Sequence, residues 1–353
     1  MKTRNICGIA LALICALSTT LKAQNIYVEN PVAGTIGEYS MDGTGTTSLI
    51  SGLAAGGMSG LAISGTNMFV VLRSSNVVAE YSTSGALLNP SFITVPGPTC
   101  ITVSGTNIFV GTVANIAEYT TSGQLVNASL LSDFAGNNPQ DVAVSGTNLF
   151  VEYYNPGFGT QIGEYTTSGQ TINATLFSFP PAPITGNMAI SGTNLYFVTE
   201  IGVSLYSTSG NYINGQIIVT GLVGQNFYAP NTAGVAFLGT NLFVSDANLN
   251  MIFEYTPNGT LVKDPVVSGV LDPYHFAFGA GPPPPTPQLS IATVGNQSVV
   301  FYPSWAAGYQ LQGVTNVSST NWVTLSNSAP IIGATVTNSL PANFFRLAPA
   351  LGQ

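Results

Sequence analysis

The chain has 353 residues, of which 14 are acidic and 6 are basic, and its formal net charge at neutral pH is −8. Nucleic acids and anionic membranes are bound by clusters of lysine and arginine, and this chain has too few basic residues to form such a cluster. The composition therefore excludes both as partners.

Residues 1–23 are predicted to be a signal peptide. Lys2 and Arg4 give it a positive start, the apolar stretch 6–17 is too short to span a bilayer, and Ala23 offers a small residue at the cleavage point. Removal of this segment would leave three basic residues against 14 acidic ones, a net charge of −11. We therefore expect an exported protein, extracellular or at the cell surface, without a membrane span.

A single cysteine, Cys100, would remain after export, because Cys7 and Cys15 lie within the signal peptide. An exported chain with one cysteine has no internal disulfide and must be stabilised by its core. We expect this chain to be a monomer.

Two phrases recur along the chain with the same period. The first is a Gly turn before an aromatic-rich strand, which begins at Ser64, Ser104, Ser145 and Ser191 as SGTN and at Leu238 as LGTN, in steps of 40, 41, 46 and 47 residues. The second is a Tyr that leads into another Gly turn, and it begins at Glu38, Glu80, Glu118, Glu164, Leu205 and Glu254. A period of forty-odd residues built from β-rich runs and Gly turns is typical of propeller blades.

Each repeat predicts four strands. In the third repeat they cover residues 141–145, 148–154, 161–166 and 170–179. The Gly and Asn residues between them suit turns with positive φ, and the β-branched and aromatic runs favour strands. Helical periodicity is absent from the sequence.

The two ends of the repeat region complement each other. Residues 25–30 (NIYVEN) match the second strand of the other repeats but have no first strand before them, and residues 274–279 (YHFAFG) match a first strand. Pairing of these two segments would remove a free sheet edge. The predicted fold is therefore all-β: a six-bladed propeller over residues 24–281 whose closing blade combines strands from both termini.

Residues 282–288 are rich in proline and are predicted to be a stiff linker. Six short strands follow within residues 289–353, which favours a small β-sandwich domain with Trp305 and Trp322 in its core. The pattern of Tyr-x-Leu-Gln, Thr-Asn, Asn-Trp and a terminal Phe-Phe-Arg-Leu resembles a C-terminal module of secreted proteins from environmental bacteria. That resemblance leaves attachment, surface sorting and accessory folding open as roles.

One repeat resembles a known family. Residues 241–262 (NLFVSDANLNMIFEYTPNGTLV) contain a strand ending in Val-x-Asp, an Asn, a short apolar strand, an aromatic residue and a turn Gly. This unit resembles the NHL repeat, and the resemblance extends more loosely over residues 24–281. The other repeats lack the Val-x-Asp acid, and all lack the Arg common after the Asn. The chain also resembles gluconolactonase-type propellers, which have the same architecture but a less similar sequence. That resemblance implies a metal held by carboxylates and amides at the channel mouth.

The inner strands of a propeller line its channel, and the residues at their start surround one mouth. The six equivalent residues differ while the strands after them repeat: Gly60, Cys100, Asp141, Asn187, Gly234 and His275. We predict that Asp141, Asn187, His275 and Cys100 bind a ligand, with Asp141 and Asn187 as ligands of a divalent cation such as Ca²⁺. The alternative is that they only solvate a narrow channel.

His275 is the single histidine of the chain and its candidate catalytic residue. Zinc hydrolases and amidating lyases use several histidines, so the sequence does not favour those chemistries. Asp246, Asn248 and Asn250 imitate the start of a calcium loop, but Met251 and Pro257 stand where that loop needs Gly and Glu. We interpret this segment as a blade turn.

Five of the six Tyr turns begin with a glutamate. A residue repeated in the same place of each blade indicates a shared structural contact, for which a backbone amide or a Ser or Thr of the next blade is the expected partner. These glutamates are therefore not expected to form a binding site.

Three functions are compatible with these observations. The leading one is a binding module for a protein, a glycan or a small polar ligand, for which the loops around Tyr153, Tyr154, Phe158 and Phe227 could offer an aromatic face. The alternative is a metal-dependent hydrolase or lactonase at the channel mouth. The third is a structural surface or matrix protein, because one propeller backbone can host all of these activities.

Overall fold

The computed structural model describes residues 24–132, 134, 138–155, 159–179, 187–199, 202–218, 234–247 and 249–280, and six short strands between residues 290 and 349. The predicted signal peptide and proline-rich linker lie outside these residues. The chain divides into two compact units between Pro282 and Pro283.

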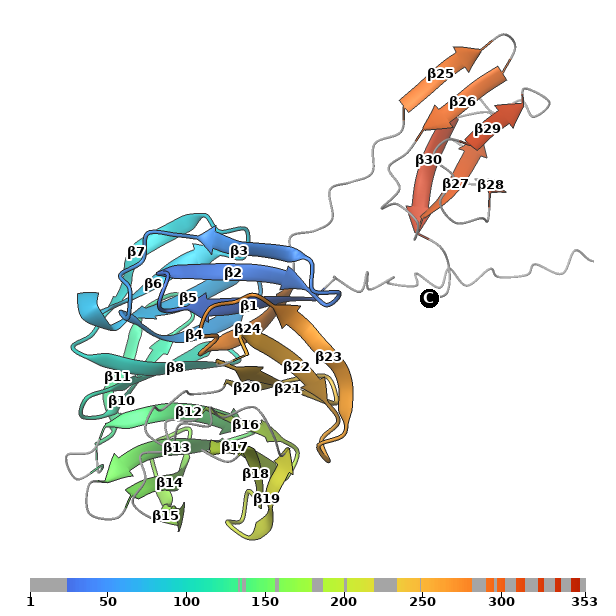
Figure 1. Ribbon diagram of the computed structural model, residues 1–353. Coiled ribbons are helices and arrows are strands. Elements are labelled where there is room, and N and C mark those ends of the chain that lie inside the picture. Colours follow the sequence, from blue (N-terminus) through green and yellow to red (C-terminus); the bar gives the residue numbers. More distant parts are fainter. Residues whose placement is uncertain are drawn as a thin grey trace, which may run out of the picture. The chain divides into compact units, whose positions relative to one another are not determined.

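The described residues from 24 to 280 form six four-stranded antiparallel sheets, which we call blades 1–6 (Figure 1). Blade 1 contains β24 (Phe276–Ala280), β1 (Gln24–Asn30), β2 (Thr35–Ser40) and β3 (Gly45–Ile50). Blade 2 contains β4 (Met58–Ser64), β5 (Asn67–Leu72), the 3₁₀ helix η1 (Arg73–Ser75), β6 (Val77–Ser82) and β7 (Leu87–Thr94). Blade 3 contains β8 (Pro98–Ser104), β9 (Asn107–Thr112), β10 (Ile116–Thr120) and β11 (Leu125–Leu131).

The remaining blades repeat this arrangement. Blade 4 contains β12 (Pro139–Ser145), β13 (Asn148–Asn155), β14 (Gly159–Thr166) and β15 (Thr171–Ser178). Blade 5 contains β16 (Met188–Ser191), β17 (Asn194–Thr199), β18 (Gly202–Ser207) and β19 (Tyr212–Ile218). Blade 6 contains β20 (Val235–Leu238), β21 (Asn241–Asp246), β22 (Met251–Tyr255) and β23 (Leu261–Ser268).

Blade 1 closes the ring as the sequence predicts. Its inner strand β24 comes from the end of the repeat region and pairs antiparallel with β1, in a register that places Gln24 opposite Ala280 and Val28 opposite Phe276. Each inner strand contacts the inner strand of the next blade, and β24 contacts both β20 and β4. Blades 1 and 4 therefore lie on opposite sides of the channel.

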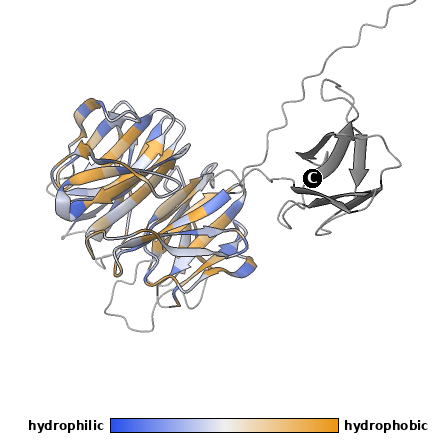
Figure 2. Cartoon of the chain, turned by 90° about the horizontal axis from the view of Figure 1, so that it is seen from above, coloured by the Kyte–Doolittle hydropathy of each residue, from blue (hydrophilic) through white to orange (hydrophobic). Residues whose placement is uncertain are grey.

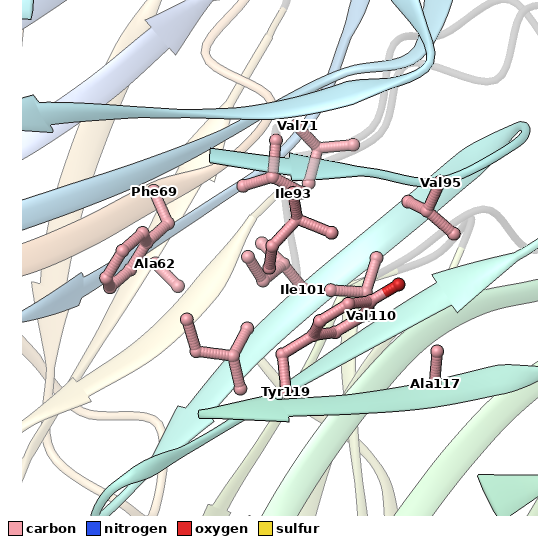
Figure 3. Close-up of a cluster of buried hydrophobic side chains, with 11 residues drawn as sticks. Ala62, Phe69, Val71, Ile93, Val95, Ile101, Val110, Ala117 and Tyr119 are labelled. Carbon is pink, nitrogen blue, oxygen red and sulfur yellow. The ribbon is translucent and has the colours of Figure 1, made fainter. Parts of the chain in front are cut away.

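The core of the propeller lies between the blades. Six clusters of buried apolar side chains each combine residues from two adjacent blades. Figure 3 shows the cluster between blades 2 and 3, where Phe69 and Ile93 from one blade pack near Val110 and Tyr119 from the other. Because burial of apolar surface is the main stabilising contribution to folding, every blade depends on both neighbours.

The two repeated turns need glycine for different reasons: the first for its positive φ alone, and the second also because a neighbouring backbone lies close. Gly65, Gly105, Gly146, Gly192 and Gly239 of the first phrase have φ between +58° and +62°, and nothing lies within 4 Å of a Cβ added to them. The glycines of the second phrase also have positive φ, and a Cβ on any of them would lie within 3.2 Å of a carbonyl oxygen in the outermost strand of the preceding blade: Gly43, Gly85, Gly123, Gly169, Gly210 and Gly259. These turns therefore contribute to blade–blade packing. Figure 2 shows hydrophilic residues mainly at the ends of the blades and apolar residues along the strands.

The described residues of the second unit form six strands in two three-stranded sheets. One sheet has the order β25 (Ser290–Val294), β26 (Gln297–Phe301), β29 (Ala334–Thr337), and the other β28 (Val323–Ser326), β27 (Tyr309–Val314), β30 (Phe344–Pro349). The β-sandwich remains a prediction, and Trp305 and Trp322 lie outside the described residues. Within the described part of the chain, no helix has the length and apolar character needed to span a membrane.

Candidate functional site at the channel mouth

All six residues that the repeat alignment places at the start of the inner strands line one cavity of about 250 Å³: Gly60, Cys100, Asp141, Asn187, Gly234 and His275. Apolar residues of the same strands, among them Met188 and Phe276, complete its wall. The structure thus brings the predicted site residues together.

Asp141 is held in place by backbone amides. Its Oδ1 accepts a hydrogen bond from its neighbour Val142 N at 2.8 Å, and its Oδ2 accepts one from Met188 N of blade 5 at 2.7 Å. Removal from water raises the pKa of the Asp141 carboxyl above its ordinary value, and these hydrogen bonds and the nearby imidazole of His275 oppose the shift without cancelling it. The position of Asp141 in the channel wall therefore favours the protonated carboxyl more than exposure to water would.

Asn187 and His275 are fixed by contacts that involve blade 1. The amide Nδ2 of Asn187 donates to the carbonyl oxygen of Tyr274 at 3.0 Å, and Asn187 lines the cavity. The Nδ1 of His275 lies 2.9 Å from Oε2 of Glu29, and the His275 ring also contacts the ring of Tyr274 edge-on. Both side chains are therefore oriented before any ligand binds.

Glu29 is a site residue that the sequence analysis missed. It is the fifth residue counted from Asn25, which corresponds to the first Asn of the second strand in the other blades. Its side chain is 1% exposed and contacts His275, which is 15% exposed. The equivalent residues of the second strands in the other blades are Val71, Gly111, Glu152, Val198 and Ser245. An acid in blades 1 and 4, at a position that is apolar or small in the other four blades, is a signal that the repeat pattern already contained.

Two acids therefore occupy the same position in opposite blades. In blade 4 Glu152 is the register partner of Asp141, and in blade 1 the Glu29 backbone N–H donates to the carbonyl of His275 at 2.8 Å. Both glutamates are fully buried. Blade 4 thus has two acids opposite each other in the strand register, and blade 1 has the contact between Glu29 and His275.

Cys100 lies in the wall of the cavity and also in the core between blades 3 and 4. Its register partner is Gly111, and a Cβ at that position would overlap the Cys100 sulfur. Burial raises the pKa of the Cys100 thiol, and the carboxylates of Asp141 and Glu152 raise it further. The thiol is therefore protonated and inert at neutral pH.

A second, wider hollow of about 380 Å³ shares Asn187 and His275 with the first cavity, and we call it the vestibule. Its wall includes Gln140, Tyr274 and two charged residues, Arg73 and Asp272. Burial raises the pKa of the Asp272 carboxyl. A ligand in the inner cavity would therefore lie next to the polar vestibule, whose wall includes the basic residue Arg73.

The predicted Ca²⁺ site does not fit the geometry. Both oxygens of Asp141 accept backbone amides, and among the described residues no three His, Cys, Asp or Glu side chains converge to hold a metal ion. Ca²⁺ takes six to eight oxygen ligands, often from several carboxylates. Asp141 and Asn187 alone cannot provide them, so we derive no chemistry through a metal.

The repeated glutamates have a structural contact, but its partner differs from the expected one. In five blades the Asn of the first phrase donates to the glutamate of the second phrase in the same blade at 2.5–2.8 Å: Asn25–Glu38, Asn67–Glu80, Asn107–Glu118, Asn148–Glu164 and Asn241–Glu254. Because Asn and Glu lie diagonally on adjacent strands of one blade, the bond closes each blade locally and does not join it to the next.

The aromatic face expected in blade 4 is not present at Tyr153. That side chain is buried in the core between blades 3 and 4, where its ring packs against Phe134 and its hydroxyl donates to the carbonyl of Ala174 at 2.6 Å. Phe158 and Phe227 lie outside the described residues. The segment after Asp246 forms a turn in which Leu249 N donates to Asp246 Oδ1, consistent with a blade turn.

Comparison with known proteins supports the fold. No protein-family model matches the sequence, and no curated protein does. A chain from the crystal structure of a nidogen–laminin complex is 13% identical with a TM-score of 0.56, and the match covers 72% of this chain and 98% of that one. A gluconolactonase from Xanthomonas campestris is 11% identical (TM-score 0.44; 69% of this chain, 82% of that chain), and regucalcin, a calcium-binding protein from Agrobacterium tumefaciens, is 12% identical (TM-score 0.43; 69% and 81%).

At these identities the likeness shows the fold alone, and we rest it on the nidogen–laminin chain, whose TM-score exceeds 0.5. Together with the six sheets and their closure, the comparison establishes an all-β, six-bladed propeller. The polar residues that differ between the blades at the start of the inner strands lie together at one mouth of its channel.

Proposed function

We propose that the protein is an exported, NHL-like propeller that binds a small polar ligand at the mouth of its channel. The observation that carries this proposal is the convergence of the six variable rim residues on one cavity. The blades share one packing arrangement, so most positions repeat from blade to blade. Side chains that differ between blades at one equivalent position are best explained by a functional site at that position.

The size and chemistry of the cavity limit the ligand. Ligand pockets for drug-sized molecules usually have volumes of about 300–1,000 Å³. A cavity of about 250 Å³ suits a molecule the size of a monosaccharide or an amino acid. Asp141, Asn187 and His275 offer a carboxylate, an amide oxygen and an imidazole on a wall that also has apolar parts, which is the usual composition of a specific polar site.

The shared fold does not choose between a small ligand and a protein partner. The related structures include a nidogen–laminin complex and a gluconolactonase, so propellers of this shape carry both kinds of function. The buried, pre-oriented groups at the mouth favour the small ligand, because a protein partner would contact exposed side chains and could not enter the cavity. A structural protein would need no such groups.

Thermal unfolding with a panel of hexoses, sugar acids and amino acids tests the proposal. A ligand that binds only the folded state at about 100 times its Kd stabilises it by about 2.7 kcal/mol, and the Tm rises by several degrees. We expect Asn187→Ala to abolish this rise. The matched control is Asn89→Ala, because Asn89 is exposed on β7 and its side chain also makes one hydrogen bond, in which Oδ1 accepts from Ser91 N.

Two results would contradict the proposal. One is a panel in which no compound changes the Tm. The other is a rise in Tm that persists in Asn187→Ala, which would mean that the ligand binds elsewhere. Self-association without ligand binding would favour the structural alternative, and conversion of a lactone during the assay would favour the hydrolase.

A further inference from the structure

Glu29 and His275 are held together both by a main-chain hydrogen bond and by a side-chain contact. The Glu29 backbone N–H donates to the carbonyl oxygen of His275 at 2.8 Å, so the strands β1 and β24 hold the two residues side by side. The side chains meet at 2.9 Å between Glu29 Oε2 and His275 Nδ1. Glu29 is almost completely buried, while His275 lines both the inner cavity and the vestibule.

This contact determines which imidazole nitrogen faces a ligand. An ionised carboxylate has no proton to donate, so it accepts from Nδ1 and fixes the neutral ring as the Nδ1–H tautomer. Nε2 then has a free lone pair on the other side of the ring. A buried carboxylate that orients an imidazole in this way is the arrangement that activates histidine as a general base.

We propose that Glu29 is a positioning residue that holds His275 as a general base toward the cavity at the channel mouth. The inference rests on the proposed binding of a small polar ligand there, and it adds that this ligand, or a water beside it, has an O–H group whose proton is removed.

The proton transfer is balanced within the pair. Nε2 accepts the proton from the O–H group, the oxygen keeps the bonding electron pair, and the ring becomes an imidazolium. The Glu29 carboxylate stabilises the positive charge that forms on the ring. Return of the proton from Nε2 to the same oxygen restores the neutral imidazole and the O–H group. Asp141, in the opposite blade, and the thiol of Cys100 are the other titratable groups on the wall of the cavity.

A purely structural ion pair explains this geometry less well. The second oxygen of the Glu29 carboxylate, Oε1, is buried and has no hydrogen-bond partner among the described residues. A buried polar atom without a partner is costly, and such atoms need an explanation beyond stability. The main-chain ladder already joins β1 to β24, so ring closure does not depend on the side-chain pair.

The single histidine allows a direct test without knowledge of the ligand. In ¹⁵N-labelled full-length protein at neutral pH, long-range ¹H–¹⁵N spectra contain the signals of one imidazole. We expect Nδ1 to be protonated and Nε2 to be unprotonated in the wild type. Glu29→Gln should replace this state by a mixture or by the Nε2–H tautomer, while Glu29→Asp should keep part of it.

Glu152→Gln is the matched control, because it removes a buried acid from the same strand position in the opposite blade without touching His275. The tautomer should not change in this variant. As a second measurement, diethyl pyrocarbonate acylates unprotonated imidazole nitrogen, and its rate at His275 should fall about tenfold in Glu29→Gln if Nε2 is the accessible atom.

The wild-type spectrum decides the proposal even if Glu29→Gln does not fold. An Nε2–H tautomer in the wild type would refute it, as would a His275 that reacts with the reagent only after unfolding. A change of tautomer in Glu152→Gln as large as in Glu29→Gln would show a general effect of lost charge and would also refute it. If the tautomer is as expected but no compound binds, the proposed ligand function fails while the Glu29–His275 geometry stands.

Discussion

The bond between the two repeated phrases makes a quantitative prediction about stability. In blade 3, Asn107 donates to the Glu118 carboxylate at 2.8 Å, and Glu118 is 8% exposed. A hydrogen bond to a charged group contributes about 1.5–3 kcal/mol. Burial raises the pKa of Glu118, so desolvation offsets part of this contribution. We therefore expect a coupling free energy of about 1.5–2 kcal/mol between the two side chains.

A double-mutant cycle measures this coupling. Urea unfolding of the wild type, Asn107→Ala, Glu118→Ala and the double variant gives four free energies of unfolding. Asn107→Ala should cost about 2 kcal/mol, because it leaves a buried carboxylate without its partner, and the Tm should fall by about 4–8 °C. The double variant should be destabilised by less than the sum of the single changes.

Blade 5 is the internal control for the cycle, because Leu205 replaces the glutamate there. Asn194→Ala removes the same Asn without leaving a carboxylate unpaired, so it should destabilise the protein less than Asn107→Ala does. A coupling below about 0.5 kcal/mol, the range in which independent sites are additive, would refute the reasoning. Equal costs for Asn107→Ala and Asn194→Ala would do the same.

Four further predictions follow from the packing and the site. In urea unfolding, Gly169→Ala should destabilise the protein by at least about 1 kcal/mol more than Gly146→Ala. Both glycines have positive φ, but only at Gly169 would the added Cβ lie 2.7 Å from the Leu130 carbonyl oxygen. Equal costs would contradict a role of Gly169 in blade packing. Cys100 should react with Ellman's reagent only upon unfolding, and rapid reaction in the native protein would show an open channel wall. The free energy of unfolding should fall as pH rises from 3.8 through the raised pKa of Asp141, because in this range the folded state binds more protons than the unfolded state. Asp141→Asn should remove this pH dependence. If the pH dependence is unchanged in Asp141→Asn, it comes from other groups. EDTA or excess Ca²⁺ should leave the Tm unchanged, and a rise with Ca²⁺ that Asp141→Ala abolishes would restore the metal site.

The sequence by itself determined the architecture, because repetition is a property of the chain. The spacing of the two phrases predicted the strands of each blade. Residues 25–30 match a second strand without a first strand before them, and this predicted the closure between β1 and β24. The positions at the start of the inner strands also followed from the repeat, so Asp141, Asn187 and His275 could be placed at one mouth before any contact was known.

Only the tertiary structure decided which side chains meet. The partner of His275 is Glu29, 246 positions away in the chain, and the partner of the repeated glutamates is an Asn on the adjacent strand. Neither follows from composition or spacing, because a strand pattern fixes which face a side chain occupies but not the neighbour that the closed ring brings to it. The burial of Tyr153 and the role of Gly169 in packing have the same origin, since the cores lie between blades and a single repeat contains only half of each.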